Sequence, residues 1–125
     1  MKLTRKGLVK KLDKVFSIYI RTRFAKNEIA ECVTCGKKDH WKNLQAGHFM
    51  SRKNYSTRWH PTNVQVQCSK CNVFNYGEQY KFGLYLEREY GVGTAEELRI
   101  TARGLVKLAN YEIEDKIKYY IDLST

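Results

Sequence analysis

The segment Cys32-Val-Thr-Cys35 is followed by a second pair in Cys68-Ser-Lys-Cys71, and 32 residues separate the two pairs. Two thiolates on one tight turn can both face a single ion about 2.3 Å away, as they do in structural zinc sites. Four such ligands close a tetrahedral ion, which then holds structure and leaves no position for hydrolysis. An iron–sulfur cluster is the alternative, although such clusters more often draw three cysteines from one compact run.

The chain is strongly basic, with 23 Lys and Arg against 13 Asp and Glu and a formal net charge of +10. Residues 1–26 contain nine basic residues and only Asp13, and residues 37–60 contain six and only Asp39. A surface of this sign attracts phosphate backbones, so nucleic acid is the first partner to consider. A surface that serves solubility alone is the alternative.

No apolar run approaches the roughly 20 residues that a membrane span needs, and no secretory signal follows the basic N-terminus. All four cysteines belong to the two pairs. We therefore expect a cytoplasmic protein without a membrane partner, because in a reducing compartment such pairs favour metal over disulfide. A chain of 125 residues is expected to form one domain.

Hydrophobic periodicity predicts an α+β fold. Apolar residues recur at helical spacing over residues 4–25, which indicates a basic amphipathic helix within residues 1–26. Residues 63–67 alternate as a strand does, and residues 44–49 are its expected antiparallel neighbour. Together with the next helix these strands form the expected zinc-stapled core, residues 27–90.

The remaining pattern is helical. A helix is expected from Cys71 to Tyr90, and its predicted buried face is listed here: Val73, Tyr76, Tyr80 and Leu84. The segment Thr94-Ala-Glu-Glu97 is typical of a capping box that opens a short helix. A last amphipathic helix is indicated by Val106, Ala109, Ile113, Ile117 and Tyr120. Residues 91–125 are thus predicted to be C-terminal helices.

Three polar residues lie at the ends of these core elements: His48, Asn63 and Asn72. Hydrolysis of a phosphodiester needs a base for water and a cation for the charge that develops on phosphate. His48 is mostly neutral at pH 7 if its pKa is unperturbed, so it can act as the base. The carbonyl of Asn72 is a hard ligand suited to Mg²⁺ or Mn²⁺, whereas Asn63 is expected to orient the imidazole or to fix the connecting loop.

These motifs resemble a known family. The segments Gln45-Ala-Gly-His-Phe49 and Gln67-Cys-Ser-Lys-Cys-Asn72, with Arg52, Asn63 and Gly77, look like the phage NinG (Rap) recombination nucleases. More broadly, the pattern is similar to His-Asn-His (ββα-metal, or His-Me finger) endonucleases and to phage endonuclease VII. The resemblance spans roughly residues 30–98.

The resemblance implies a ββα-metal core in which His48 is the general base, Asn63 the middle asparagine and Asn72 the ligand of a catalytic Mg²⁺ or Mn²⁺. Many relatives place a further metal ligand, Asp, immediately before the base, but this chain has Gly47 there. Gln45 and His60 are the two candidates for the ligand that this glycine cannot supply.

The implied activity is a metal-dependent DNA endonuclease acting on branched recombination intermediates, Holliday junctions or displacement loops. Arg52, Lys53 and Arg58 in the loop after His48 are expected to bind the DNA phosphate, and Tyr55 is a candidate for a nucleobase. Symmetric nicking would need a homodimer, paired through the N- and C-terminal helices. Three alternatives remain: an HNH nuclease for ordinary duplex, a non-catalytic zinc-bearing DNA-binding module, and a zinc-based protein adaptor.

Overall fold

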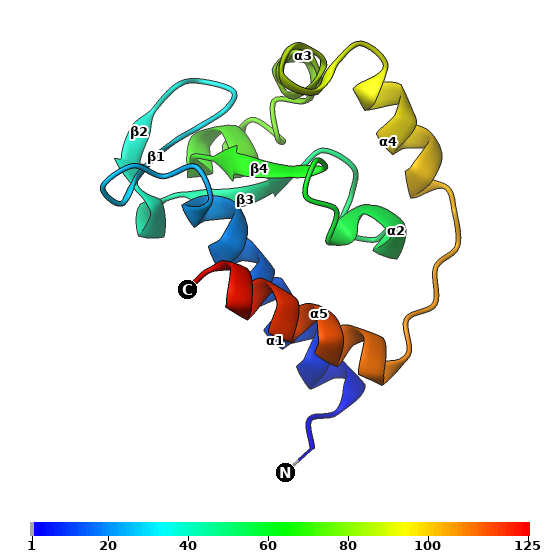
Figure 1. Ribbon diagram of the computed structural model, residues 1–125. Coiled ribbons are helices and arrows are strands. Elements are labelled where there is room, and N and C mark those ends of the chain that lie inside the picture. The colour runs from blue at the N-terminus through cyan, green and yellow to red at the C-terminus, as the bar shows by residue number, and fades with distance from the viewer. Residues whose placement is uncertain (1) are drawn as a thin grey trace.

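The computed structural model describes residues 2–125, which form five α-helices, two short helical turns and two antiparallel two-stranded sheets (Figure 1). In chain order the elements are α1 (Arg5–Thr22), β1 (Ile29–Glu31), β2 (Lys38–His40), the 3₁₀ turn η1 (Trp41–Asn43), β3 (Gln45–His48), α2 (Tyr55–Arg58), β4 (Val64–Gln67), the π-helical turn η2 (Lys70–Phe74), α3 (Gln79–Tyr90), α4 (Thr94–Ala102) and α5 (Asn110–Leu123). The predicted α+β class is confirmed.

Helix α1 packs along α5, so the two ends of the chain share one core (Figure 1). The Thr4 hydroxyl caps α1 by accepting a hydrogen bond from the Gly7 N–H at 3.1 Å. The buried stripes of the two helices are Leu8, Leu12, Phe16 and Ile20 from α1 and Ile113, Ile117 and Tyr120 from α5. Helices α1 and α5, the terminal helices suggested for pairing in a homodimer, bury these apolar faces in the core of one chain.

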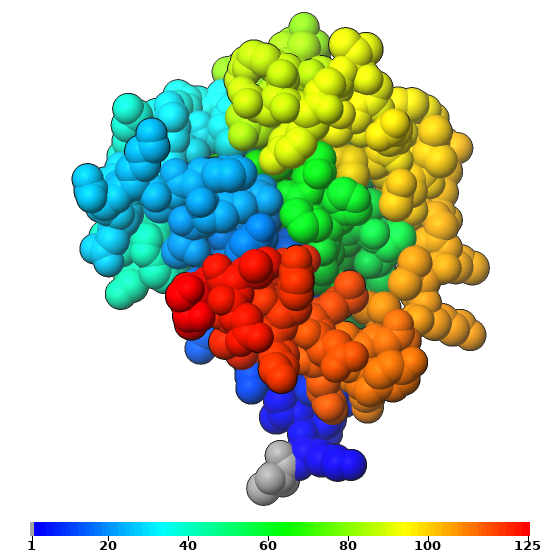
Figure 2. Space-filling view, viewed as in Figure 1, coloured from blue at the N-terminus to red at the C-terminus, as the bar shows by residue number. Residues whose placement is uncertain are grey.

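Strands β3 and β4 pair as predicted, with His48 opposite Val64 and Gln45 opposite Gln67. Helix α1 packs against both strands. The C-terminal residues, orange and red in Figure 2, lie on the side of the molecule where α1 packs. Every residue of β4 is buried. This hairpin is therefore covered on its α1 side and fixed in place.

The hairpin formed by β1 and β2 was not predicted from the sequence, because each strand has only three residues and neither shows an apolar alternation. Ile29 pairs with His40, and Glu31 pairs with Lys38. The first cysteine pair lies in the turn between these strands. This small sheet therefore carries the turn that contains Cys32 and Cys35.

The single helix expected from Cys71 to Tyr90 is wrong, because the chain turns sharply between η2 and α3. Tyr76 and Glu78 adopt positive φ angles of 54° and 49°, and Gly77 lies between them at 86°. The break changes the helical phase, so α3 buries Phe82 and Leu86 instead. The predicted face is exposed, with Tyr76 at 89% and Tyr80 at 80%, and Val73 and Leu84 are also exposed.

Two details of the C-terminal helices also differ from prediction. Helix α4 begins at Thr94, but Gly93 is the N-cap, and the Thr94 N–H donates to the Glu87 carboxylate at 3.0 Å instead of entering a capping box. Val106 precedes α5 and is exposed. Leu98 of α4 joins Phe82 in a second, smaller core.

Within residues 2–125, none of the helices combines the length and the apolar character that crossing a bilayer requires.

Candidate active site and metal cluster

The two cysteine pairs meet, as the spacing predicts. The four Sγ atoms lie within 4.8 Å of one another, and those of Cys35 and Cys68 are 3.6 Å apart. Thiolates around a tetrahedral ion with bonds of about 2.3 Å are about 3.8 Å apart, so the cluster has the dimensions that one zinc ion needs. Cys35 is exposed, whereas Cys32, Cys68 and Cys71 are buried.

Backbone hydrogen bonds shape the first cysteine turn and join it to β4, the strand that leads into the second. The Gly36 N–H donates to the Cys32 carbonyl at 2.9 Å, and Gly36 has the positive φ of 81° that closes this turn. The Val33 N–H donates to the carbonyl of Val66 in β4 at 2.9 Å, which joins the first turn to the strand that precedes Cys68.

The thiols of the cluster differ in acidity. Burial opposes ionisation of Cys32, but hydrogen bonds from Thr34 and from backbone N–H groups outweigh it and lower its pKa to about 6. Burial raises the pKa of Cys71 to about 12. Without a cation, therefore, the cluster does not hold all four sulfurs as thiolates at neutral pH.

His48 ends β3 with its imidazole orientation fixed. Its Nε2 lies 2.9 Å from the carbonyl oxygen of Arg58, and because a carbonyl only accepts, Nε2 carries the proton in this contact. Nδ1 is then the basic nitrogen. Burial lowers the pKa of His48 below 6.5, the nearby Arg52 charge lowers it further, and the Arg58 carbonyl opposes the shift. The side chain is therefore a neutral imidazole at pH 7.

His48 borders a hollow of about 490 Å³ that also contains Arg52 and Asn72. The remaining lining residues come from α1, β3 and the following loop: Asp13, Lys14, Phe16, Ser17, Ala46 and Ser51. The structure thus brings together an imidazole, an amide and a guanidinium from residues spread over positions 48–72 of the chain. A phosphate group would meet two positive charges here, Arg52 and Lys14.

Asn72 lies in η2 and donates from Nδ2 to Oε1 of Gln45 at 2.8 Å. Gln45 is therefore adjacent to Asn72. His60 is engaged elsewhere, since its Nδ1 accepts from the Thr62 N–H at 3.2 Å. Of the two candidates for the missing ligand, only Gln45 contacts Asn72.

At position 47, directly before His48, a side chain would meet the buried Gln67 side chain. A Cβ on Gly47 would lie 1.9 Å from Oε1 of Gln67, which is buried and fixed through Nε2 by the Gly77 carbonyl at 2.8 Å. The space that a side chain at position 47 would need is thus already filled.

Asn63 is fully buried and holds the loop between β3 and β4. Its Oδ1 accepts from the Met50 N–H at 2.8 Å, and its Nδ2 donates to the carbonyls of Met50 and Thr57 at 3.2 and 3.0 Å. Asn63 was expected either to orient the imidazole or to fix the connecting loop, and these contacts match the second role. Asn63 thus has its polar atoms turned to the backbone of the loop and does not line the hollow.

Asp13 of α1 is a site residue that the sequence reasoning missed. Its carboxylate accepts from Nε and Nη2 of Arg58 at 3.0 and 2.5 Å, from Arg52 at 2.9 Å and from the Trp59 indole at 2.9 Å. Burial opposes its ionisation, but the Arg58 hydrogen bonds and charge outweigh this and lower the pKa of Asp13. The available signal was its isolation as the single acid among the nine basic residues of 1–26.

The basic loop is divided in its contacts. Both Arg58 and Arg52 pair with Asp13, but Arg58 is 16% exposed, whereas Arg52 is 58% exposed and lines the hollow. Lys53 is exposed and does not line the hollow. Tyr55 packs edge-on against Trp59 at 5.0 Å between ring centres, so its ring is partly used in the core.

Residues 2–123 match the family model described as bacteriophage lambda NinG protein. No curated protein and no solved structure matches the chain.

Proposed function

The chain belongs to the bacteriophage lambda NinG protein family, and we propose that it is a metal-dependent DNA endonuclease whose base is His48. The observation that carries this proposal is the contact between His48 Nε2 and the Arg58 carbonyl at 2.9 Å, which leaves Nδ1 unprotonated on a side chain that borders the hollow together with Lys14 and Arg52. In this proposal β3, β4 and η2 form the ββα-metal unit. His48, Asn63 and Asn72 are then its His-Asn-Asn set.

The chemistry of the site follows from the protonation state of His48. Nδ1 accepts a proton from a water as the water oxygen bonds to phosphorus, while the bond from phosphorus to the leaving sugar oxygen breaks and that oxygen takes a proton from solvent. The Arg58 carbonyl, which accepts from Nε2–H, stabilises the imidazolium that results. Arg52 and Lys14 offset charge on the nonbridging oxygens. Because the pKa of His48 lies below 6.5, activity should rise as the pH increases through that pKa and level off near neutral pH.

Asn72 and Gln45 are the residues that would hold the catalytic cation. Their amide oxygens are hard donors of the kind that Mg²⁺ and Mn²⁺ accept, and both side chains are neutral. Asn72 lines the His48 hollow and Gln45 does not, and the Asp13 carboxylate that also lines it is engaged by Arg58. The anionic ligands would therefore come from substrate phosphate, and the bound cation would supply neutralisation of the charge developing on the phosphate.

The cysteine cluster would hold a structural zinc ion. Four sulfur ligands are a soft, closed set, which fits zinc and leaves no place for a substrate. Because Asn72 directly follows Cys71, the cluster would also fix the position of the catalytic amide. Two ions with separate tasks are thus proposed, and different side chains hold each.

The proposed substrate is branched DNA, and this choice rests on the family resemblance together with the net charge of +10. A test compares wild type with His48→Ala on labelled four-way junction and on linear duplex. His40→Ala is the matched control, because His40 lies on β2 outside the hollow. The divalent cation is omitted in one arm instead of chelated, since a chelator would also compete for the ion at the thiolates.

Wild type and His40→Ala should cut the junction only with Mg²⁺ or Mn²⁺, and His48→Ala should lose at least 100-fold in rate. Equal cutting by His48→Ala would refute the assignment of the base. Binding of DNA without any cutting by wild type would instead indicate a non-catalytic module. Equal cutting of junction and linear duplex would favour an HNH nuclease for ordinary DNA.

A further inference from the structure

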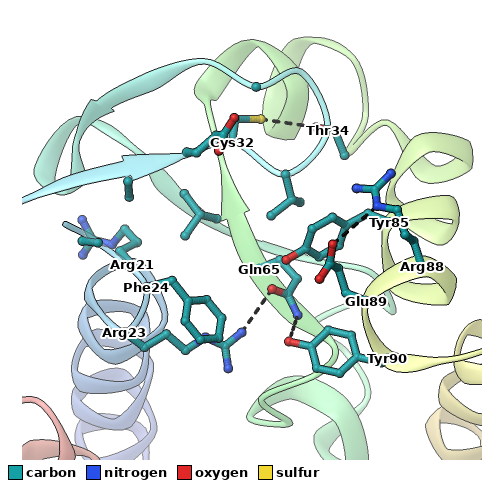
Figure 3. Close-up of a pocket in the computed structure, with 16 residues that line it drawn as sticks. Arg21, Arg23, Phe24, Cys32, Thr34, Gln65, Tyr85, Arg88, Glu89 and Tyr90 are labelled. Carbon is teal, nitrogen blue, oxygen red and sulfur yellow. Dashed lines mark hydrogen bonds and ion pairs between the residues drawn. The ribbon is translucent and has the colours of Figure 1, made fainter.

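A second cavity, of about 710 Å³, shares no lining residue with the His48 hollow. It lies between the end of α1, the first cysteine turn, β4 and α3 (Figure 3). Its volume is within the range of small-ligand pockets, which is about 300–1,000 Å³. Of its lining residues, only Cys32 has a role in the function proposed above, as a ligand of the structural ion.

The polar wall of this cavity is fixed by a chain of hydrogen bonds. Gln65 is buried, and its Oε1 accepts from Nη2 of Arg23 at 3.2 Å while its Nε2 donates to the Tyr90 hydroxyl at 3.1 Å (Figure 3). Nη2 of Arg23 also donates to the Val64 carbonyl at 3.1 Å. The arginine is therefore held in place before any ligand arrives.

One donor in this wall has no acceptor among residues 2–125. Nε of Arg23 is buried without a hydrogen-bond partner, although a buried N–H that lacks a partner costs about 1–3 kcal/mol. Because Nε itself is buried, a ligand in the cavity would meet the charge of Arg23 and not this N–H. The charge of Arg23 favours an anion.

Aromatic rings carrying guanidinium groups border the cavity from two elements. Phe24, just beyond α1, has the Arg23 guanidinium 4.8 Å from its ring centre, and Tyr85 of α3 has that of Arg88 at 5.6 Å (Figure 3). Phe24 is 66% exposed, so its ring is accessible to a ligand. Flat apolar faces next to cations are the surfaces on which nucleobases stack while their phosphates are neutralised.

We propose that this cavity binds an unpaired nucleotide of a DNA strand, with its base against Phe24 and Tyr85 and its phosphate near Arg23 and Arg88. The proposal rests on the proposed function and names a feature of its substrate. Val64, whose carbonyl is held by Arg23, is the cross-strand partner of His48, so the cavity and the hollow adjoin the same hairpin. Branched DNA, which has unpaired nucleotides at its branch point, could occupy both.

The test measures binding of a fluorescent ten-residue oligothymidine and of a duplex of equal length, by anisotropy and without added divalent cation. Phe24→Ala and Arg88→Ala are the variants, and both remove side chains that are mostly exposed, at 66% and 68%. The controls are Tyr111→Ala, whose exposure of 67% matches Phe24, and Arg103→Ala, which is charge-matched to Arg88. Neither control residue lines the cavity.

Phe24→Ala should weaken single-strand binding at least about fivefold and leave duplex binding within about twofold. Unchanged single-strand binding by both cavity variants would overturn the proposal. So would an equal loss on single strand and duplex, which would indicate a general electrostatic surface.

Cleavage of the four-way junction by wild type is measured separately. Cleavage together with unchanged oligonucleotide binding would overturn the nucleotide site alone. Phe24-dependent binding without cleavage would support the nucleotide site and refute the nuclease.

Discussion

Asp13→Asn removes the charge that joins α1 to the loop carrying the Arg58 carbonyl, while it keeps the size of the side chain. The new amide can still accept from Trp59 and from one nitrogen of Arg58, but its NH₂ group faces the Nη2 donors of Arg58 and Arg52. The Asp13 and Arg58 side chains are 24% and 16% exposed, so their lost hydrogen bond is worth about 1.5–3 kcal/mol. Arg52 is 58% exposed and adds at most about 1 kcal/mol.

We therefore expect Asp13→Asn to lower the free energy of unfolding by about 2–3 kcal/mol at pH 7. The folded-state pKa of Asp13 is lowered, so this stabilisation is present above the unfolded value near 3.8 and is lost as the pH falls through the folded pKa. The wild type should thus lose stability on acidification below about pH 5 more steeply than the variant.

The assay is urea unfolding at a series of pH values from 3 to 7, followed by junction cleavage at pH 7. Asp115→Asn is the control, because Asp115 is exposed on α5 and has no ion pair within residues 2–125. Cleavage by Asp13→Asn should fall about 10- to 100-fold, since the carbonyl that orients His48 loses its anchor. A variant with wild-type stability, acid slope and cleavage rate would refute the reasoning.

Three further predictions concern the scaffold. Cys68→Ser should remove about one equivalent of zinc per chain and lower the melting temperature, and unchanged metal content by mass spectrometry would contradict the cluster. Gly47→Ala should cost about 1–3 kcal/mol because its Cβ meets Gln67, whereas Gly7→Ala, whose Cβ has only ordinary contacts, should be neutral or stabilising in the same urea titration. Asn63→Ala should cost about 3 kcal/mol by leaving the Met50 N–H unpaired, and a loss below 1 kcal/mol would show that water replaces the amide.

The sequence predicted those elements whose pattern is local. The amphipathic stripe of α1, the pairing of β3 with β4 and the meeting of the two cysteine pairs follow from helical period, strand alternation and ligand spacing. The prediction of one continuous helix after Cys71 failed because three consecutive residues with positive φ change the helical phase. Two of them, Tyr76 and Glu78, are of residue types that do not indicate such a turn.

Some residues of the candidate site could likewise be predicted from the sequence, and others could not. His48 and Asn72 could be named from residue type and position in the motif, and the structure places both on one hollow. Gln45 became the stronger partner of Asn72 only through their 2.8 Å contact. Asp13 could not be assigned, because no local pattern says that a helix 45 residues earlier will meet Arg58.

By itself, the sequence determined the ligand chemistry, the basic charge and the family, because these depend on which residues are present and on short spacings along the chain. Tertiary structure alone decided which nitrogen of His48 carries the proton, that Gln67 fills the space beside Gly47, and that Asp13 anchors the loop. Each of these depends on contacts between segments distant in sequence. Their geometry is set by how α1, the hairpin and the cysteine turns pack together.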